Sequence, residues 1–210
     1  MKKNLPFFAV LFLFSLQLQA RKIEGIIIYE KDTLNVVFNI PVRLIFNDPD
    51  FEKLQQGVVY FDARGKRQTL RAYRAREFRF RFGDEEVRMV AVNRPQLPGY
   101  RIMPGEEQMF LKLRIDGPLR LFQYYRPAEE PDRTDKYAEV MPPAFSVDFN
   151  YYYLQKKGRE IKYPEGFSFK NDMSDYFTDC PGLSQLLESK ELRKGDLETI
   201  VNYYNTNCGD

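Results

Sequence analysis

Apolar and polar residues alternate along most of the first 165 positions, in short segments separated by turn residues. Phe78, Phe80 and Phe82, for example, alternate with Arg79 and Arg81, which places three rings on one strand face and two cations on the other. From residue 166 onward the apolar spacing becomes helical. Strand-like segments followed by helical ones predict an α+β fold: an antiparallel β-sheet, roll or open barrel of about eight to ten strands, then a short C-terminal helical segment.

The first hairpin shows how this pattern predicts a register. The apolar positions before residue 30 and those from Leu34 to Ile40 fall on one side of the sheet if a two-residue turn at Lys31-Asp32 joins the strands. Pro41 follows, and proline cannot donate a hydrogen bond to a neighbouring strand. We therefore expect the hairpin to end there.

A later hairpin allows two registers. A two-residue turn at Asp116-Gly117 would put the apolar residues of its two strands on opposite sides of the sheet. Apolar residues alternate over 109–115 and again over 119–121, and a three-residue loop over 116–118 puts both sets on one side of the sheet. The opposite side then combines cations with aromatic rings, which are enriched at binding hot spots. With two arginines of the preceding strands, this candidate binding face comprises Phe110, Lys112, Arg114, Arg120, Phe122, Tyr124, Arg126, Arg79 and Arg81. The alternative is that the C-terminal helices or segment 127–143 cover these rings and make them a second core.

Three short helices are expected after residue 166. Apolar residues at helical spacing mark the first over 169–177, Pro181 suits the first turn of the second, and Asp196 opens the last. Cys180 and Cys208 are the only cysteines. We predict a disulfide between them, which would stabilise the chain by about 3 kcal/mol. A catalytic or metal-binding thiol is the alternative, but no histidine is present to activate it.

The first twenty residues have the pattern of a secretory signal. Lys2 and Lys3 precede an apolar run over 5–16, and Ala20 offers a small residue for cleavage. We expect residues 1–20 to be a signal peptide, 21–165 an antiparallel β-rich domain, and 166–210 a helical segment packed on or beside it. The alternative is an uncleaved anchor, although the run is shorter than the ~20 apolar residues that a span needs. No transmembrane span is expected after cleavage.

Composition narrows the possible functions. The 210 residues include no histidine, 14 tyrosines and 18 phenylalanines, with 43% hydrophobic and 30% charged residues. Without histidine the usual hydrolase triads, the commonest zinc sites and the usual general base near pH 7 are excluded. We expect no catalytic residue, metal site or cofactor. Adjacent carboxylates, such as those at 84–86, are expected to be solvated surface groups because neighbours in a strand or turn point apart.

Charge is distributed unevenly although the net charge is only +2. Residues 64–94 contain ten Lys or Arg against four Asp or Glu, a local charge of +6; residues 160–210 contain five against ten, a local −5. The basic stretch could bind anionic glycans, lipid headgroups or nucleic acid. It could instead dock on the chain's own acidic helical segment, or simply be solvated.

Short segments occur in a particular order along the chain. They are Gly25-Ile26-Ile27 with Asp32-Thr33-Leu34, Tyr60-Phe61-Asp62 with Gly65-Lys66, Phe78-Arg79-Phe80, Phe110-Leu111 with Gly117-Pro118-Leu119-Arg120-Leu121, Tyr153-Leu154 with Lys156-Lys157-Gly158, and Tyr176-Phe177-x-Asp179-Cys180-Pro181. In this order they resemble uncharacterised secreted proteins of the Bacteroidota, which end in a short helical segment with a similar Cys-Pro. The resemblance spans most of the chain, contains no catalytic motif and assigns no active site. It implies an exported protein of a Gram-negative envelope.

We therefore expect an exported protein, periplasmic, outer-membrane-associated or secreted. It would act as a non-catalytic binding or assembly module through an aromatic and basic sheet face. An envelope protein or an anionic glycan or lipid would be the partner, and no nucleic acid is expected. The alternatives are a hydrolase-type enzyme with a carboxylate-based site and a structural partner of an outer-membrane complex. A cleft gathering carboxylates with perturbed pKa values would favour the enzyme.

Overall fold

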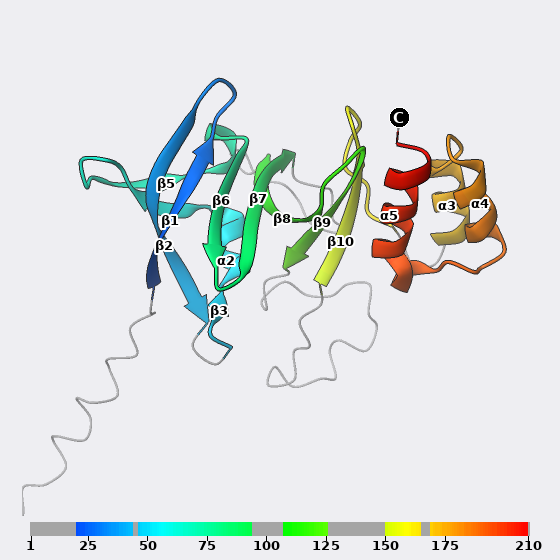
Figure 1. Ribbon diagram of the computed structural model, residues 1–210, viewed down its shortest axis with the longest axis horizontal. Coiled ribbons are helices and arrows are strands. Elements are labelled where there is room, and N and C mark those ends of the chain that lie inside the picture. The colour runs from blue at the N-terminus through cyan, green and yellow to red at the C-terminus, as the bar shows by residue number, and fades with distance from the viewer. Residues whose placement is uncertain (1–19, 44–45, 94–106, 126–149, 165–168, 210) are drawn as a thin grey trace, which may run out of the picture.

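Ten strands form one antiparallel sheet, and short helices lie beside it (Figure 1). The computed structural model describes residues 20–43, 46–93, 107–125, 150–164 and 169–209. This architecture confirms the predicted α+β class. Most of the expected leader, the loop expected over 93–105, segment 127–143 and Arg126 lie outside the described residues, apart from Asn93 at the end of a strand.

The sheet consists of two antiparallel meanders that are joined where β1 pairs with β6. Its order is β10-β9-β8-β7-β6-β1-β2-β4-β5, with β3 paired to the end of β2, so β5 and β10 are the two outermost strands. The strand bounds are β1 (Ala20–Ile28), β2 (Thr33–Arg43), β3 (Asp48–Pro49), β4 (Val58–Phe61), β5 (Arg67–Leu70), β6 (Glu77–Phe82), β7 (Glu85–Asn93), β8 (Gln108–Ile115), β9 (Leu119–Tyr125) and β10 (Asn150–Lys156).

Helices occur at two places in the chain. The helix α2 (Phe51–Gln56) and the 3₁₀ turn η1 (Ala72–Arg74) interrupt the first half of the sheet. The C-terminal segment holds α3 (Phe169–Tyr176), α4 (Pro181–Glu188), the 3₁₀ turn η4 (Lys194–Asp196) and α5 (Leu197–Asn207). These last helices lie at the β10 end of the molecule, whereas β5 lies at the other end (Figure 1).

The first hairpin has the predicted facing but a different turn. Ile27 pairs with Leu34, and the Tyr29 N–H donates to the carbonyl of Asp32 at 2.8 Å. The two turn residues are therefore 30 and 31 rather than 31 and 32. Relative to the predicted register, the two strands are shifted by two residues in total. Because side chains alternate with a period of two, the same apolar faces still meet.

The described pairing of β1 with β2 ends at Pro41, as predicted, although the strand β2 itself does not end there. Pro41 pairs with Ala20, and β2 continues to Arg43. Proline lacks only the donor group, and the carbonyl of Pro41 still accepts a hydrogen bond from the N–H of Asp50 at 2.8 Å. A proline at the end of a ladder is therefore compatible with the strand.

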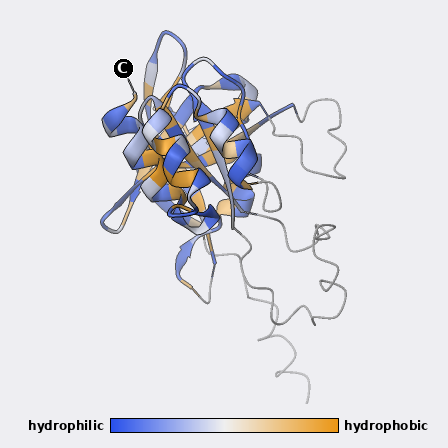
Figure 2. Cartoon of the chain, turned by 90° about the vertical axis from the view of Figure 1, so that its right-hand side faces the viewer, coloured by the Kyte–Doolittle hydropathy of each residue, from blue (hydrophilic) through white to orange (hydrophobic). Residues whose placement is uncertain are grey.

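Three apolar clusters hold the fold together. The first lies between α2 and the strands around β1, and includes the completely buried Ile27, Phe38, Leu54 and Phe78. The second joins β9 and β10 to the C-terminal helices, whose apolar residues gather in the interior while polar residues face outward (Figure 2). The third lies on the opposite face of β7 to β10; its members are Val90, Val92, Met109, Leu111, Leu113, Phe122, Tyr124 and Tyr153.

Candidate functional site

The aromatic and basic face predicted on β8 and β9 does not form. The strands end at residue 115 and resume at 119, as the three-residue loop requires, but the register shifts between them. Ile115 pairs with Leu121, whereas Leu113 pairs with Phe122. This bulge inserts one residue into β8 and reverses the alternation beyond it. Phe122 and Tyr124 therefore join the leucines of β8 instead of lying beside Phe110.

The rings of this face are buried in cores, but the C-terminal helices do not cover them: Phe110 belongs to the first apolar cluster, and Phe122 and Tyr124 belong to the third. Phe110 and Phe122 are completely buried and Tyr124 is 2% exposed. Lys112 is also buried, with its Nζ 2.7 Å from a carboxylate oxygen of Glu85 and 4.3 Å from the ring centre of Phe51 on α2. Phe110 and Lys112 stabilise the packing of α2 on the sheet, whereas Phe122 and Tyr124 pack in the third apolar cluster, and none of the four is available to a partner.

Two of the predicted binding arginines, Arg79 and Arg120, belong to an internal ion-pair network. Arg79 and Arg88 donate to Glu77 at 2.6 and 2.7 Å, and Arg88 and Arg120 donate to Asp116 at 2.8 and 3.0 Å. Burial would raise the pKa of both carboxyl groups, but the arginine hydrogen bonds outweigh it and lower the pKa values. Each charge in this network has a partner of opposite sign.

The remaining predicted cations are scattered. Arg114 lies at the bulge, 3.5 Å from Glu198 on α5. Arg81 is exposed on β6, and Arg126 lies outside the described residues. The residues predicted for one binding face are therefore distributed among a core, an ion-pair network and separate surface positions.

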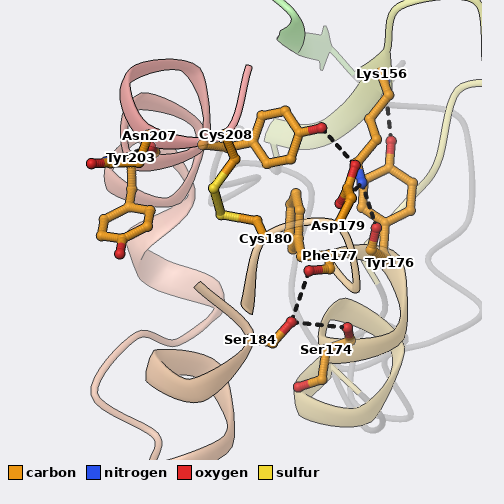
Figure 3. The surroundings of a disulfide bond; sticks show 11 residues. Lys156, Ser174, Tyr176, Phe177, Asp179, Cys180, Ser184, Tyr203, Asn207 and Cys208 are labelled. Atoms are coloured by element: carbon orange, nitrogen blue, oxygen red, sulfur yellow. Dashed lines mark hydrogen bonds and ion pairs between the residues drawn. A yellow bond between two sulfur atoms is a disulfide. The ribbon is translucent and has the colours of Figure 1, made fainter. Parts of the chain in front are cut away.

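A buried lysine joins β10 to the helical segment (Figure 3). Lys156 Nζ donates to Asp179 and to the backbone carbonyl of Tyr176, both at 2.6 Å. The ring centres of Tyr176, Phe177 and Tyr204 lie 4.7, 5.1 and 4.9 Å from the same nitrogen. Burial lowers the pKa of Lys156, although the bond to Asp179 acts in the opposite direction. We call Lys156, Asp179 and the three rings the lysine cluster.

Asp179 is the more exposed member of the lysine cluster. Its second carboxylate oxygen accepts a hydrogen bond from the hydroxyl of Tyr204 at 2.8 Å. Burial would raise the pKa of Asp179, but the bonds from Lys156 and Tyr204 hold it below the usual value. The polar atoms of this cluster bond to one another, as expected for an anchor between helices and sheet.

The predicted disulfide is confirmed. Cys180, just before α4, is bonded to Cys208, just after α5, with their Cα atoms 5.6 Å apart. The bond and the lysine cluster are neighbours in the second apolar cluster (Figure 3). An intrachain disulfide is compatible with export, since such bonds persist in oxidising compartments.

An open groove of about 810 Å³ lies between α3 and α4, with two carboxylates among its polar residues. Among the described residues, no group of three or more cysteines and acidic residues is placed to hold a metal ion. None of their helices is long and apolar enough to cross a membrane.

Six exposed cations follow one another in residues 64–76, from the β4–β5 turn through β5 and η1 to the residue before β6. We call this set the basic row; its members are Arg64, Lys66, Arg67, Arg71, Arg74 and Arg76, and all six are exposed. None forms an ion pair within 4.0 Å with a carboxylate of a described residue. Residue 62 is the only acid within 62–76, and its carboxylate is bound by backbone N–H groups of its own turn.

The basic row does not dock on the chain's own acidic helices. Arg64, Lys66 and Arg67 lie in the β4–β5 turn and in β5, whereas η1 packs against β7 and β8, and Arg76 is bonded to β1 and β7. The helices α3, α4 and α5 lie beyond β10 (Figure 1). One large ring accompanies the row: Tyr73 in η1, which is 62% exposed. The charge count over 64–94 indicated this region. Most of the predicted binding residues nevertheless came from β8 and β9, because the alternation of side chains along those strands predicted one shared face.

Comparison with known proteins identifies no relative. No protein-family model matches the chain, and neither a curated protein nor a solved structure does. Its function must therefore be inferred from the chemistry of its own surface.

Proposed function

We propose that this chain is an exported, non-catalytic binding module of the cell envelope that holds an anionic partner on the basic row. The observation that carries the proposal is the set of six exposed cations without a carboxylate partner among the described residues. Surfaces that serve only solubility usually intersperse both signs of charge. The ion-pair network around Arg88 shows that the same sheet pairs its arginines elsewhere.

Protection of the sheet edge accounts for only part of the row. β5 is an outermost strand, and charged side chains on an edge strand discourage pairing with other chains. That role fits Arg67, which lies within β5. It does not explain Arg64 in the turn or Arg74 and Arg76 in and after η1.

The state of the carboxylates favours binding over catalysis. The pKa is lowered at Asp62, Glu77, Asp116 and Asp179, and in each case hydrogen bonds to the ionised form outweigh burial. A general acid of a hydrolase needs the opposite shift, so that it holds its proton near neutral pH. These four groups have the properties of structural ion pairs and turn caps.

Export is supported by the leader-like pattern over 1–20 and by the disulfide. The polymers and headgroups of a bacterial envelope carry many phosphate and carboxylate groups. A salt-sensitive association with such groups is the behaviour that the basic row favours.

The proposal is tested by cosedimentation of the purified protein with an envelope fraction from its native host. The variant Arg64→Glu/Arg67→Glu/Arg76→Glu reverses three charges whose side chains have no bonds within the described structure. We expect its affinity to fall at least about tenfold, and wild-type affinity to fall as salt is raised from roughly 0.05 to 0.5 M.

The matched control is Lys157→Glu/Lys170→Glu/Lys190→Glu, which makes the same charge change on exposed residues at the helical end. It should bind within about twofold of wild type, because exposed charges beyond a Debye length are screened. Unchanged binding by the basic-row variant, or equal loss in both variants, would rule out the row as the site. Circular dichroism and the unfolding midpoint establish that each variant is folded.

A further inference from the structure

A single exposed aromatic ring lies within the basic row. Tyr73 is in η1 between Arg71 and Arg76, and its side chain is 62% exposed. The guanidinium carbon of Arg74 lies 5.4 Å from the centre of this ring. Most of the ring is thus open to solvent, next to cations that have no carboxylate partner in the described structure.

The row is extended rather than gathered around one point. Arg67 and Arg71 are both in extended backbone, so their side chains fall on the same face of the strand. Four residue steps at about 3.3 Å each separate them by roughly 13 Å. Arg64 and Lys66 continue the row into the hairpin turn and Arg74 continues it into η1, while Arg76 lies where the chain returns to the sheet between β1 and β7. A compact anion would meet one or two of these charges, whereas a linear polymer could meet them in succession.

We propose that the basic row binds a linear anionic polysaccharide, with one sugar ring stacked on Tyr73 and the acidic groups of neighbouring sugars paired with the arginines. This inference rests on the proposed function and names its partner class. Aromatic rings accept the apolar C–H face of a sugar, and guanidinium groups bind carboxylates or sulfates through two parallel hydrogen bonds. Tyr73 and its neighbouring arginines supply both kinds of contact.

A lipid surface fits this arrangement less well. Elements that lie in a membrane interface bury an apolar face beneath the headgroups. Between residues 62 and 76, Tyr73 is the only exposed large apolar side chain, and Leu70 faces the core. A polymer of phosphate alone would bind the cations but has no apolar face to stack on the ring of Tyr73.

The experiment compares four probes by fluorescence anisotropy or calorimetry on the full chain. Polygalacturonate carries one carboxylate per sugar, and its methyl-esterified form has the same sugars without the charge. Inorganic polyphosphate carries charge without sugar, and phosphatidylglycerol vesicles provide an anionic lipid surface. We expect wild type to bind polygalacturonate at least about tenfold more tightly than the ester, since the arginines need an anionic partner.

The variant Tyr73→Ala separates stacking from charge. We expect it to weaken polygalacturonate binding about five- to tenfold and to leave polyphosphate binding within about twofold. Phe46→Ala removes another exposed ring, 66% exposed and outside the row, and should change neither affinity. Arg67→Glu/Arg71→Glu should weaken the binding of both polymers.

The outcomes separate this inference from the proposed function. If Tyr73→Ala has no effect, or weakens both polymers equally, the polysaccharide inference is wrong and the row binds anions by charge alone. Tighter binding to the vesicles than to polygalacturonate would make the partner a lipid surface. If no soluble polymer binds while the triple-reversal variant still loses envelope association, only the polysaccharide inference fails. If that variant also keeps its envelope association, both proposals fail.

Discussion

The two charged members of the lysine cluster should respond very differently to removal. The side chain of Lys156 is 6% exposed, whereas that of Asp179 is 43% exposed. Asp179→Asn keeps the shape and the acceptor for Tyr204, but leaves the buried ammonium without its carboxylate. Lys156→Met leaves a carboxylate that water can reach, and puts a flexible apolar side chain among three aromatic rings.

We expect Asp179→Asn to be the more destabilising change. Loss of a hydrogen bond between charged groups costs about 1.5 to 3 kcal/mol, and a stranded buried charge adds to that cost. We predict a loss of about 2 to 3 kcal/mol for Asp179→Asn and about 1 kcal/mol for Lys156→Met. The exposed neighbours Lys157→Met and Asp175→Asn are matched controls, and each should change stability by less than about 0.5 kcal/mol.

Urea unfolding followed by tyrosine fluorescence and circular dichroism measures these differences, since the chain has no tryptophan. The double variant Lys156→Met/Asp179→Asn should recover most of the loss of Asp179→Asn, because no buried charge remains. Burial lowers the folded-state pKa of Lys156, so the unfolded chain holds this proton to higher pH and folding is favoured as pH rises. The penalty of Asp179→Asn should therefore shrink toward about pH 10. An equal or larger loss for Lys156→Met would refute this account.

Three further changes test other parts of the fold. Cys180→Ser with Cys208→Ser should lower stability by about 3 to 4 kcal/mol in thermal unfolding, with hydrogen exchange rising mainly in α3 to α5; equal stability would contradict it. Gly25→Ala should cost about 2 to 3 kcal/mol in urea, because the new methyl group would collide with the backbone carbonyl of Arg79 on β6 and lie 2.7 Å from the Phe38 ring; a neutral variant would show that β1 and β6 can separate. Glu77 has a lowered folded-state pKa, so its contribution is present above about pH 4 and is lost as pH falls through that folded pKa. Glu77→Gln should therefore weaken the fold at pH 7 but flatten its acid denaturation curve, and parallel curves would disprove the linkage.

The sheet was predictable where one strand face is buried and the other is solvated. The alternation of Phe78 and Phe80 with arginines identified β6 correctly, and both rings are buried. The facing of the first hairpin was also correct despite its shifted turn, because a slip of one position in each strand preserves the pairing of apolar faces. Hydrophobic periodicity therefore predicts which strand faces meet more reliably than it predicts which residues form the turn.

β8 could not be predicted in the same way because it is buried on both faces. Phe110 packs in the first apolar cluster, while Leu111 and Leu113 pack in the third. Lys112 is buried although alternation assigned it to solvent. The bulge before Ile115 has no glycine or proline to mark it, and a single inserted residue reverses every later facing. The reversal places Phe122 and Tyr124 in the third apolar cluster, among residues of β7, β8 and β10, and local sequence does not encode such packing.

The basic row and the lysine cluster also could not be predicted fully from the sequence. The charge count identified the cationic stretch, but only the position of the helices beyond β10 excludes its docking on them. The lysine cluster joins residues from β10, α3 and α5, together with Asp179 from the turn before α4. No spacing in one segment signals such a cluster, because its members meet only in the folded chain.

A side chain of α5 completes the backbone ladder of β9. Asn205 accepts the N–H of Leu119 at 2.8 Å and donates to its carbonyl at 2.9 Å, across 86 positions of sequence. Contacts between such distant positions form late, since a long loop must close before they stabilise anything. Leu119 and Leu121 pack against α5 and its neighbours in the folded chain, so we expect both side chains to be exposed to solvent until α5 packs on them. A chain that ended before residue 205 would lack both bonds to Leu119 and part of the apolar cover of β9, so we expect it to expose an incompletely paired strand to chaperones and proteases.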